Sequence, residues 1–308
     1  MTTRFTRRQT LALAAGAAAA TALPCPTGAD AAPLMTRPIP STGERLPVVG
    51  IGTAIVFDIE GEKEKLAERT QVIRALVEGG GTLIDTAPSY GAAEDVLGEI
   101  LGATGLRPKV FLATKVCVRD RADSDAEMKQ SLQRLKTQKL DLMQLHNVRR
   151  TDQSIAHLRE WKAQGICRYV GITSSFDRDY EAVEATLKRE KPDFFQIDYS
   201  LANRNASERL IPLARDVGAA VLTNLPFGRG RLLRAVRGRT LPDWAAEFDA
   251  ASWAQLFLKY LLGNPSVTAV IPGTDKPAYM VDNLNAGRGR LPDAAMRKRI
   301  ERYFDALG

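Results

Sequence analysis

The stretch LDLMQLHNVRRTDQSIAHLREWKAQGICRYVGIT, residues 140–173, reads as a strand, a helix and a second strand. Two short apolar-rich runs, Leu140–His146 and Arg168–Thr173, predict buried strands. Between them, Gln153–Gln164 carries apolar residues at spacings of three and four, which predicts an amphipathic helix. Gly165 follows where that helix should end. The stretch therefore predicts one β–α–β unit of a parallel sheet.

The same alternation continues outward in both directions. Strands are predicted at Val48–Thr53, Thr82–Thr86, Val110–Val116, Leu140–His146, Arg168–Thr173, Phe194–Tyr199, Ala220–Leu225 and Val267–Ile271. Helices are predicted at Glu64–Glu78, Asp125–Lys136, Gln153–Gln164, Tyr180–Glu190 and Glu208–Val217, among others. Eight strand–helix repeats predict an α/β fold, a (β/α)8 TIM barrel that forms a single domain over residues 32–308. The interval from Leu225 to Pro242 has no clear periodicity, so we expect a loop at the active site there.

Composition is that of an ordinary globular protein and excludes a disordered or collagen-like chain. Hydrophobic residues make up 44% of the 308 residues and charged residues 26%. The formal charge of +7 is not concentrated in a basic stripe with interleaved aromatics, so we expect no nucleic-acid partner. One arginine-rich run is interpreted as a solvated loop or the rim of an anionic-ligand pocket: Arg229, Arg231, Arg234, Arg237 and Arg239.

The first 31 residues predict an export signal peptide rather than part of the fold. TRRQTL, residues 6–11, precedes an apolar run that is too short to span a bilayer. The paired Arg7 and Arg8 resemble a twin-arginine signal, with cleavage expected after Ala29-Asp30-Ala31 or Ala20-Thr21-Ala22. We therefore expect the export machinery as a partner of the precursor, a periplasmic location and no stable membrane insertion after signal removal. A disordered cytoplasmic extension is the alternative.

The cysteines predict no disulfide in the mature chain. Cys25 lies in the expected signal peptide, which leaves Cys117 and Cys167. Cys117 follows the end of one predicted strand and Cys167 precedes the start of another, so they lie at opposite ends of the barrel. A strand of five residues is about 16 Å long, and disulfide Cα atoms must approach within about 7 Å.

Titratable residues gather at the carboxyl ends of three consecutive strands, where parallel barrels place their chemistry. Asp85 ends the second predicted strand and Tyr90 lies in the loop after it, while Lys115 and His146 end the third and fourth. Each of these residues taken alone has an equally good structural explanation, and His157, in mid-helix, is interpreted as structural. Together they predict a site, because charges at the ends of apolar strands need polar surroundings.

These motifs identify a family resemblance that covers about Pro47 to Asn285. DTAPSYG, residues 85–91, together with ATK, residues 113–115, and LDLMQLH, residues 140–146, resembles the aldo-keto reductase signatures. The resemblance implies an NAD(P)H-dependent oxidoreductase that transfers hydride between nicotinamide and a small carbonyl or alcohol substrate. It assigns Tyr90 as general acid and base, with the Lys115 ammonium lowering the pKa of the phenol and Asp85 orienting that ammonium. His146 would donate a hydrogen bond to the carbonyl.

The resemblance also implies a cofactor site at the barrel mouth. The Gly-x-Gly-x-x-Gly motif of a Rossmann dinucleotide site does not follow the first predicted strand, so a Rossmann site is not implied. It favours NADP(H) over NAD(H). Gly273 and Tyr279 nevertheless stand where many NADP-specific members have Lys and Arg, and Asn224 stands where many have a stacking aromatic. The implied cofactor-binding residues are Thr173, Ser174, Gln196, Asn224, Leu225, Pro226, Gly273, Thr274, Lys276, Asp282 and Asn283.

Two other functions compete with the reductase. One is a cofactor-binding sensor or accessory subunit of the same fold with little turnover, and retention of all four catalytic residues favours the enzyme over it. The other is a secreted barrel hydrolase, which needs two opposed carboxylates or a metal cluster at the strand ends. The sequence places only Asp85 there, beside a lysine. Arg149, Arg150 and the arginine-rich run hint at anionic substrates.

Overall fold

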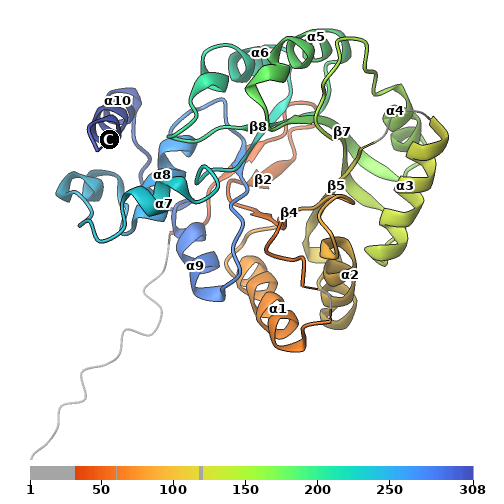
Figure 1. Cartoon of the computed structure of the whole chain (residues 1–308), viewed down its shortest axis with the longest axis horizontal. Coiled ribbons are helices and arrows are strands. Elements are labelled where there is room, and N and C mark those ends of the chain that lie inside the picture. The colour runs from red at the N-terminus through yellow and green to blue at the C-terminus, as the bar shows by residue number, and fades with distance from the viewer. Residues whose placement is uncertain (1–31, 60, 118–120, 308) are drawn as a thin grey trace, which may run out of the picture. The chain divides into compact units, whose positions relative to one another are not determined.

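The computed structural model describes residues 32–59, 61–117 and 121–307, so the predicted signal peptide lies outside the described residues. Eight parallel strands form one sheet in chain order: β3 (Ile51–Gly52), β4 (Leu83–Asp85), β5 (Phe111–Val116), β6 (Leu140–Leu145), β7 (Cys167–Ser174), β8 (Phe194–Asp198), β9 (Ala220–Asn224) and β10 (Ala269–Val270). The first and last strands meet, because Gly50 donates a hydrogen bond to the Val270 carbonyl at 2.9 Å and Val270 donates one to Val48 at 2.9 Å. The prediction of a single-domain (β/α)8 barrel is confirmed (Figure 1).

Each predicted strand region contains an observed strand, and the differences lie at the seam. The first and last strands are each two residues long, shorter than the predicted Val48–Thr53 and Val267–Ile271. The seam is tightly packed, since a side chain on Gly52 would lie 3.0 Å from the Ile271 carbonyl oxygen, just after the last strand. A glycine there lets the backbone of the first strand approach its neighbour.

Helices surround the barrel and bury their apolar faces against the strands (Figure 1). The α-helices are α1 (Lys63–Glu78), α2 (Ala93–Thr104), α3 (Arg121–Arg134), α4 (Ala156–Ala163), α5 (Tyr180–Glu190), α6 (Leu210–Asp216), α7 (Arg231–Ala235), α8 (Trp253–Leu262), α9 (Pro277–Asn285) and α10 (Ala294–Asp305). Short 3-10 helices are η1 (Arg107–Lys109), η2 (Asp177–Asp179), η3 (Asn205–Ser207) and η4 (Asp243–Phe248). The interval from Leu225 to Pro242 is therefore not entirely loop, because α7 lies within it.

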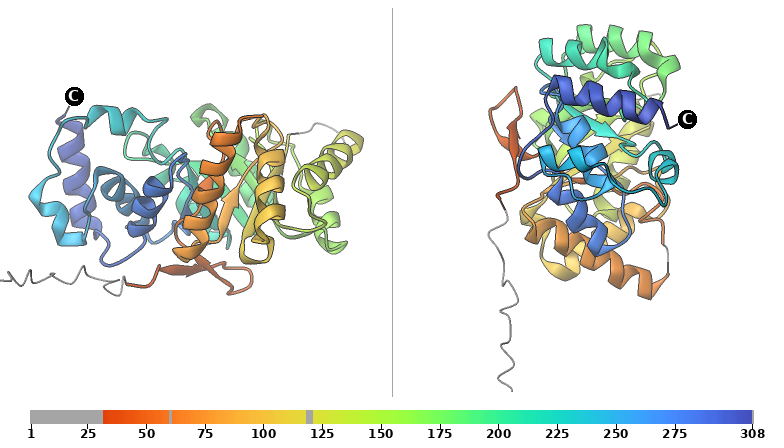
Figure 2. Two further views of the ribbon diagram at one scale, coloured as in Figure 1. Left: turned by 90° about the horizontal axis from the view of Figure 1, so that it is seen from below. Right: turned by 90° about the vertical axis from the view of Figure 1, so that its left-hand side faces the viewer.

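A β-hairpin that the sequence did not predict closes the amino-terminal end of the barrel. Its strands, β1 (Thr36–Pro38) and β2 (Arg45–Pro47), pair antiparallel, and Figure 2 shows them lying across one end of the barrel. Ile39 and Leu46 of the hairpin are buried in the same apolar cluster as the inward-facing residues of the strands: Leu83, Phe111, Ala113, Leu142, Tyr169, Phe194, Ala220, Leu222, Ala269 and Ile271. The hairpin is therefore the floor of the barrel core.

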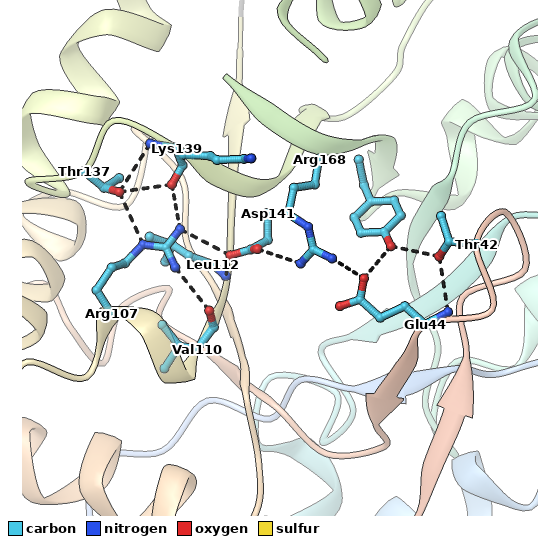
Figure 3. Close-up of polar contacts among 10 residues, drawn as sticks. Thr42, Glu44, Arg107, Val110, Leu112, Thr137, Lys139, Asp141 and Arg168 are labelled. Atoms are coloured by element: carbon cyan, nitrogen blue, oxygen red, sulfur yellow. Dashed lines mark hydrogen bonds and ion pairs between the residues drawn. The ribbon is translucent and has the colours of Figure 1, made fainter. Parts of the chain in front are cut away.

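Polar groups tie the hairpin to the strand beneath it (Figure 3). The Tyr169 hydroxyl donates a hydrogen bond to the Glu44 carboxylate at 2.6 Å and lies 2.8 Å from the Thr42 hydroxyl. Arg168 forms an ion pair with the same carboxylate. Consecutive residues of β7 thus bind one acidic group of the hairpin.

Asp141 of β6 extends this set of contacts to β5 and η1 (Figure 3). One carboxylate oxygen accepts from Arg168 at 3.0 Å, and the other accepts the Leu112 backbone N–H at 2.8 Å and Arg107 at 3.3 Å. Arg107 also donates to the Lys139 carbonyl at 2.6 Å. We call Glu44, Arg107, Asp141, Arg168 and Tyr169 the floor network, in which every charged side chain has a partner.

Two remaining expectations concern the cysteines and the membrane. Cys117 is exposed and Cys167 is buried, and both are free, as predicted. Among the described residues, no helix combines the length and apolar character needed to cross a membrane.

Candidate active site

The centre of the carboxyl end of the barrel is a buried ion pair. Lys115, the next-to-last residue of β5, is 1% exposed, and its Nζ lies 2.7 Å from Asp85 Oδ2 and 2.7 Å from the Thr86 carbonyl oxygen. Gln144 donates to the other Asp85 oxygen at 3.2 Å. Burial alone lowers the pKa of Lys115, but the charge of Asp85 and hydrogen bonds to Asp85 and Tyr90 outweigh it and leave the pKa above its usual value. The side chain is therefore a fixed ammonium at neutral pH.

Tyr90 faces this ammonium from the loop after β4. Lys115 Nζ lies 4.9 Å from the centre of the tyrosine ring. The chain then turns at Gly91, whose φ is +59° and where a side chain would collide with the Asp58 carboxylate. Burial raises the pKa of Tyr90, and the opposing effect of Lys115 is smaller. The lowering by Lys115 that the resemblance implies is present but is outweighed by burial, so Tyr90 is protonated at neutral pH, the form that can donate a proton.

His146 directly follows β6 and meets Tyr90 edge to face, with ring centres 5.9 Å apart. Burial, helped by the charges of Lys115 and Arg149, lowers the pKa of His146 to about 3, so the imidazole is neutral at pH 7. Its Nδ1 lies 3.1 Å from Cys117 Sγ and 3.4 Å from Ser89 Oγ. A thiol or hydroxyl that donates to Nδ1 leaves the ring proton on Nε2, the tautomer able to donate to a carbonyl oxygen.

The structure thus brings together Asp85, Tyr90, Lys115 and His146, which three different strands contribute. The pairwise contacts link all four: carboxylate to ammonium, ammonium to phenol ring, and phenol ring to imidazole. Such a set places one proton donor beside a fixed positive charge and a neutral hydrogen-bond donor. It can therefore stabilise and protonate an oxyanion that develops at the barrel mouth.

Next to this group lie the residues assigned to the nicotinamide carboxamide. Thr173 and Ser174 end β7, and Gln196 pairs with Thr173 in the adjacent strand β8. All three are buried. The Thr173 hydroxyl already accepts the Asn147 backbone N–H at 2.9 Å, and the Ser174 hydroxyl lies 3.4 Å from the backbone of Phe176. Gln196 Oε1, in contrast, has no hydrogen-bond partner within the described parts of the chain.

Unpartnered buried oxygens recur around this end of the barrel. Within the described ranges, side-chain oxygens on or just after strand ends that lack a hydrogen-bond partner belong to Thr86, Gln144, Asn147, Gln196, Asp198, Thr223 and Asn224. Leaving a buried polar atom unpaired costs about 1–3 kcal/mol, so such a set is typical of a site completed by a ligand. A nicotinamide cofactor, which carries amide N–H and ribose hydroxyl donors, fits it.

One site residue, Asn147, is not predicted by the sequence motifs. Asn147 adopts φ +53°, a left-handed conformation that Asn tolerates better than most residues, and it follows His146 directly. That adjacency is the signal that would have identified it. Thr223 precedes Asn224, whose amide nitrogen donates to Ser175 Oγ at 3.3 Å. Leu225 and Pro226 then lead away from β9, with Leu225 at φ +49°.

The residues assigned to the adenosine part of the cofactor lie on the segment from β10 into α9. Thr274 and Asn283 are buried, whereas Gly273 and Lys276 are exposed. Lys276 Nζ lies 5.9 Å from the centre of the Tyr279 ring, so its charge remains near the surface.

Asp282, in the same segment, has a structural role. Its two carboxylate oxygens accept hydrogen bonds from Ser252 and Gln255 at the start of α8, each at 2.7 Å. These contacts join α9 to α8. The carboxylate is thus engaged before any ligand binds.

The fold and this mouth define the class of protein, an α/β-barrel enzyme. The chain belongs to the aldo/keto reductase family, whose family model matches residues 48–302. Members of this family are NAD(P)-dependent oxidoreductases that act on small carbonyl compounds. The observed barrel and the order of the four residues along it agree with that membership.

Individual relatives show the same similarity. Methylglyoxal reductase YeaE of Escherichia coli is 30% identical over 232 residues, which cover 73% of this chain and 80% of that protein. Aldo-keto reductase str7 of Strobilurus tenacellus is 28% identical over 283 residues, with 78% of this chain and 83% of that protein covered.

Solved structures share the fold. An aldo/keto reductase from Klebsiella pneumoniae, crystallised with NADP and acetate, superposes with a TM-score of 0.71 at 24% identity, covering 85% of this chain and 93% of that chain. A glycerol dehydrogenase from Gluconobacter oxydans gives a TM-score of 0.71 at 23% identity, with 88% of this chain and 95% of that chain covered.

Proposed function

We propose that the protein reduces a small aldehyde or ketone, or oxidises the corresponding alcohol, with Tyr90 as the general acid and base. The observation that carries this proposal is the buried Lys115 ammonium, held between Asp85 and the ring of Tyr90. A structural role alone gives no reason to bury a charge beside a phenol that opens onto the barrel mouth.

The chemistry follows from the protonation states. When bound, the nicotinamide cofactor supplies the hydride that reaches the carbonyl carbon. Tyr90 then donates its phenol proton to the oxygen on which negative charge develops, and the Lys115 ammonium stabilises the phenolate that results. Neutral His146 orients the carbonyl by donating from Nε2. In alcohol oxidation the same phenolate accepts the proton.

Replacing Tyr90 by Phe tests the proposal directly. The ring remains, so the free energy of unfolding should change by less than about 1.5 kcal/mol, while kcat and kcat/KM for carbonyl reduction should fall together by about 10²- to 10⁴-fold. Tyr303→Phe, in the remote helix α10, is the matched control and should retain full activity. Cofactor titration should show unchanged binding in both variants.

The outcomes separate enzyme from sensor. Near-normal reduction by Tyr90→Phe would remove the phenol from the mechanism. A wild-type protein that binds cofactor and turns over no carbonyl would favour the alternative, a cofactor-binding sensor or accessory subunit of the same fold.

We further propose NADP(H) as the preferred cofactor, with modest discrimination against NAD(H). Related structures from Klebsiella pneumoniae contain NADP and NADPH. In this chain Lys276 is the candidate cation for the 2′-phosphate, and a charge-assisted hydrogen bond from it would contribute about 1–3 kcal/mol. Titrating both cofactors against wild type and Lys276→Ala measures that difference. A large NADPH preference that survives the substitution would show that other residues bind the phosphate.

We also propose export to the periplasm by the twin-arginine route, on the basis of Arg7, Arg8 and the apolar run after them. The double substitution Arg7→Lys and Arg8→Lys should leave folded precursor in the cytoplasm, detected by cell fractionation. Unchanged export of the double variant would contradict the route.

A further inference from the structure

A cavity of about 960 Å³ opens beside His146, and residues of α3 and α4 line part of it. Its inner wall contains His146, Ser89 and Cys117, and its outer wall contains three arginines, Arg121, Arg149 and Arg150. Two carboxylates, Asp152 and Glu160, complete that wall. The cavity therefore extends from the catalytic histidine toward a charged rim.

The arginines of the rim differ in whether a carboxylate pairs with them. Arg150 forms an ion pair with Asp152, and Arg121 forms ion pairs with Glu160 at 2.6 Å and with Asp125 at 3.1 Å. Arg149 has no ion-pair partner within the described parts of the chain. Arg149 is therefore the one arginine of this rim that no carboxylate of the described residues engages, and its guanidinium is available to an anionic group in the cavity.

Arg149 stands on a loop that is held in place from two sides. The Gln153 side-chain oxygen accepts the backbone N–H of Arg149 at 2.6 Å and that of Arg150 at 3.0 Å. From α5, Arg189 donates to the Thr151 carbonyl at 2.5 Å and to the Gln153 carbonyl. An anchored loop fixes where the arginine emerges, which lowers the entropy lost when it binds a ligand.

The charge of Arg149 also reaches the catalytic residues. It is among the causes that depress the pKa of His146, after burial and Lys115. A ligand whose carbonyl lies at His146 therefore lies within the electrostatic field of Arg149. An anionic group on the ligand would be attracted by that field and would bind more tightly, whereas a neutral ligand would leave the guanidinium bound only to water.

We infer that Arg149 selects carbonyl substrates that carry a carboxylate, with the carbonyl at Tyr90 and His146 and the carboxylate extending past His146 into this cavity, where Arg149 binds it. The planar guanidinium donates in a fork that matches the two carboxylate oxygens. The inference rests on the proposed reductase function and adds to it a substrate class, the oxo acids. Arg149 acts in this scheme as a specificity-determining residue and not in the proton transfer.

The test compares two aldehydes of matched length, 4-oxobutanoate and butanal, which differ in a carboxylate. Arg149→Gln should raise KM for 4-oxobutanoate about 5- to 10-fold, as expected for a partly solvated charged hydrogen bond, with kcat little changed. KM for butanal should stay within about twofold of the wild-type value, because butanal has no carboxylate and makes no ion pair that the substitution could remove. In the wild type, added salt should raise KM for 4-oxobutanoate alone.

Arg150→Gln is the matched control, since it removes the neighbouring guanidinium, whose charge Asp152 already balances. Both KM values should stay within about twofold in this variant. Equal effects of Arg149→Gln on the two aldehydes, or no effect on either, would overturn the inference while leaving the reductase function intact. Absence of turnover with both aldehydes in the wild type would overturn the proposed function and the inference with it.

Discussion

The two ends of this barrel use polar side chains in opposite ways. At the amino-terminal end, the carboxylates of Glu44 and Asp141 pair with the guanidinium groups of Arg168 and Arg107, so that their charges balance. At the carboxyl end, a buried ammonium faces a phenol, and oxygens such as those of Gln196 and Asn147 lack partners within the described residues.

The difference separates stability from function within one set of strands. Polar groups that satisfy one another contribute to the free energy of unfolding and offer nothing to a ligand. Polar groups left unpaired cost stability and retain their capacity to bind. Substitutions at the amino-terminal end should therefore change stability with activity intact, and substitutions of the unpaired oxygens at the carboxyl end should change ligand binding with little loss of stability.

The largest effect is expected for Lys115→Met at the carboxyl end. Without the ammonium, the phenolate of Tyr90 loses its stabilising charge, and turnover should fall by about 10²- to 10⁴-fold. The variant should also lose stability, because Asp85 remains buried without its partner. Steady-state kinetics and urea unfolding measure the two effects.

A double variant separates these effects. Lys115→Met combined with Asp85→Asn removes both charges, so it should recover most of the lost stability while activity stays low. Recovery of activity in the double variant would show that Lys115 does not act on Tyr90.

The next largest effect is expected at the floor. Asp141→Ala leaves the Leu112 backbone N–H without an acceptor and removes one partner each from Arg107 and Arg168. The free energy of unfolding should fall by about 2–4 kcal/mol, toward the lower value because both guanidinium groups are partly exposed. Activity per folded molecule should not change. A comparable loss of activity in the folded fraction would contradict the separation of the two ends.

A smaller effect is expected for Gln196→Leu. Removing an unpartnered buried oxygen should leave stability unchanged or raise it by up to about 1 kcal/mol, while the Kd for cofactor rises about 3- to 10-fold. Fluorescence titration and urea unfolding measure these. Gln255→Leu is the paired control, since Gln255 binds Asp282 at 2.7 Å and accepts from Ala251 at 2.9 Å. That control should lose stability instead.

The smallest effect on kcat is expected when pH is varied around neutrality. Reduction requires a protonated Tyr90 and is lost as pH rises through its raised pKa, which lies above the usual value of about 10. At the acid side, His146 becomes charged only as pH falls through about 3. The kcat for a neutral aldehyde should therefore be nearly constant between about pH 5 and 9. A tenfold change between about pH 6 and 8 would indicate a histidine that titrates near its ordinary pKa.

Sequence alone predicted the features that depend on short-range patterns. Eight strands follow from their apolar runs and the glycines that separate them from the helices. Asp85, Lys115 and His146 could be grouped because the carboxyl ends of parallel strands meet at one end of a barrel, whatever the helices do.

The remaining features depend on contacts between distant segments. The hairpin has few residues and several prolines, and only the barrel core explains why Ile39 and Leu46 are apolar. Asn147 becomes a site residue only because its side-chain oxygen is buried without a partner. The direction of the Tyr90 pKa depends on the balance between burial and the charge of Lys115, and no motif records the depth of burial.

The hairpin also closes the amino-terminal end of the barrel, so only the carboxyl end is left for a ligand to enter. Ser41 lies exposed in the turn between β1 and β2. Figure 2 shows this hairpin across one end of the barrel, and the candidate active site lies at the carboxyl ends of the strands. A thiol introduced at Ser41 in a variant without Cys117, and coupled to a gold electrode or a bead, would orient every molecule with its mouth toward solution. The floor network, which cross-links the hairpin to three strands, would carry the mechanical load of that attachment.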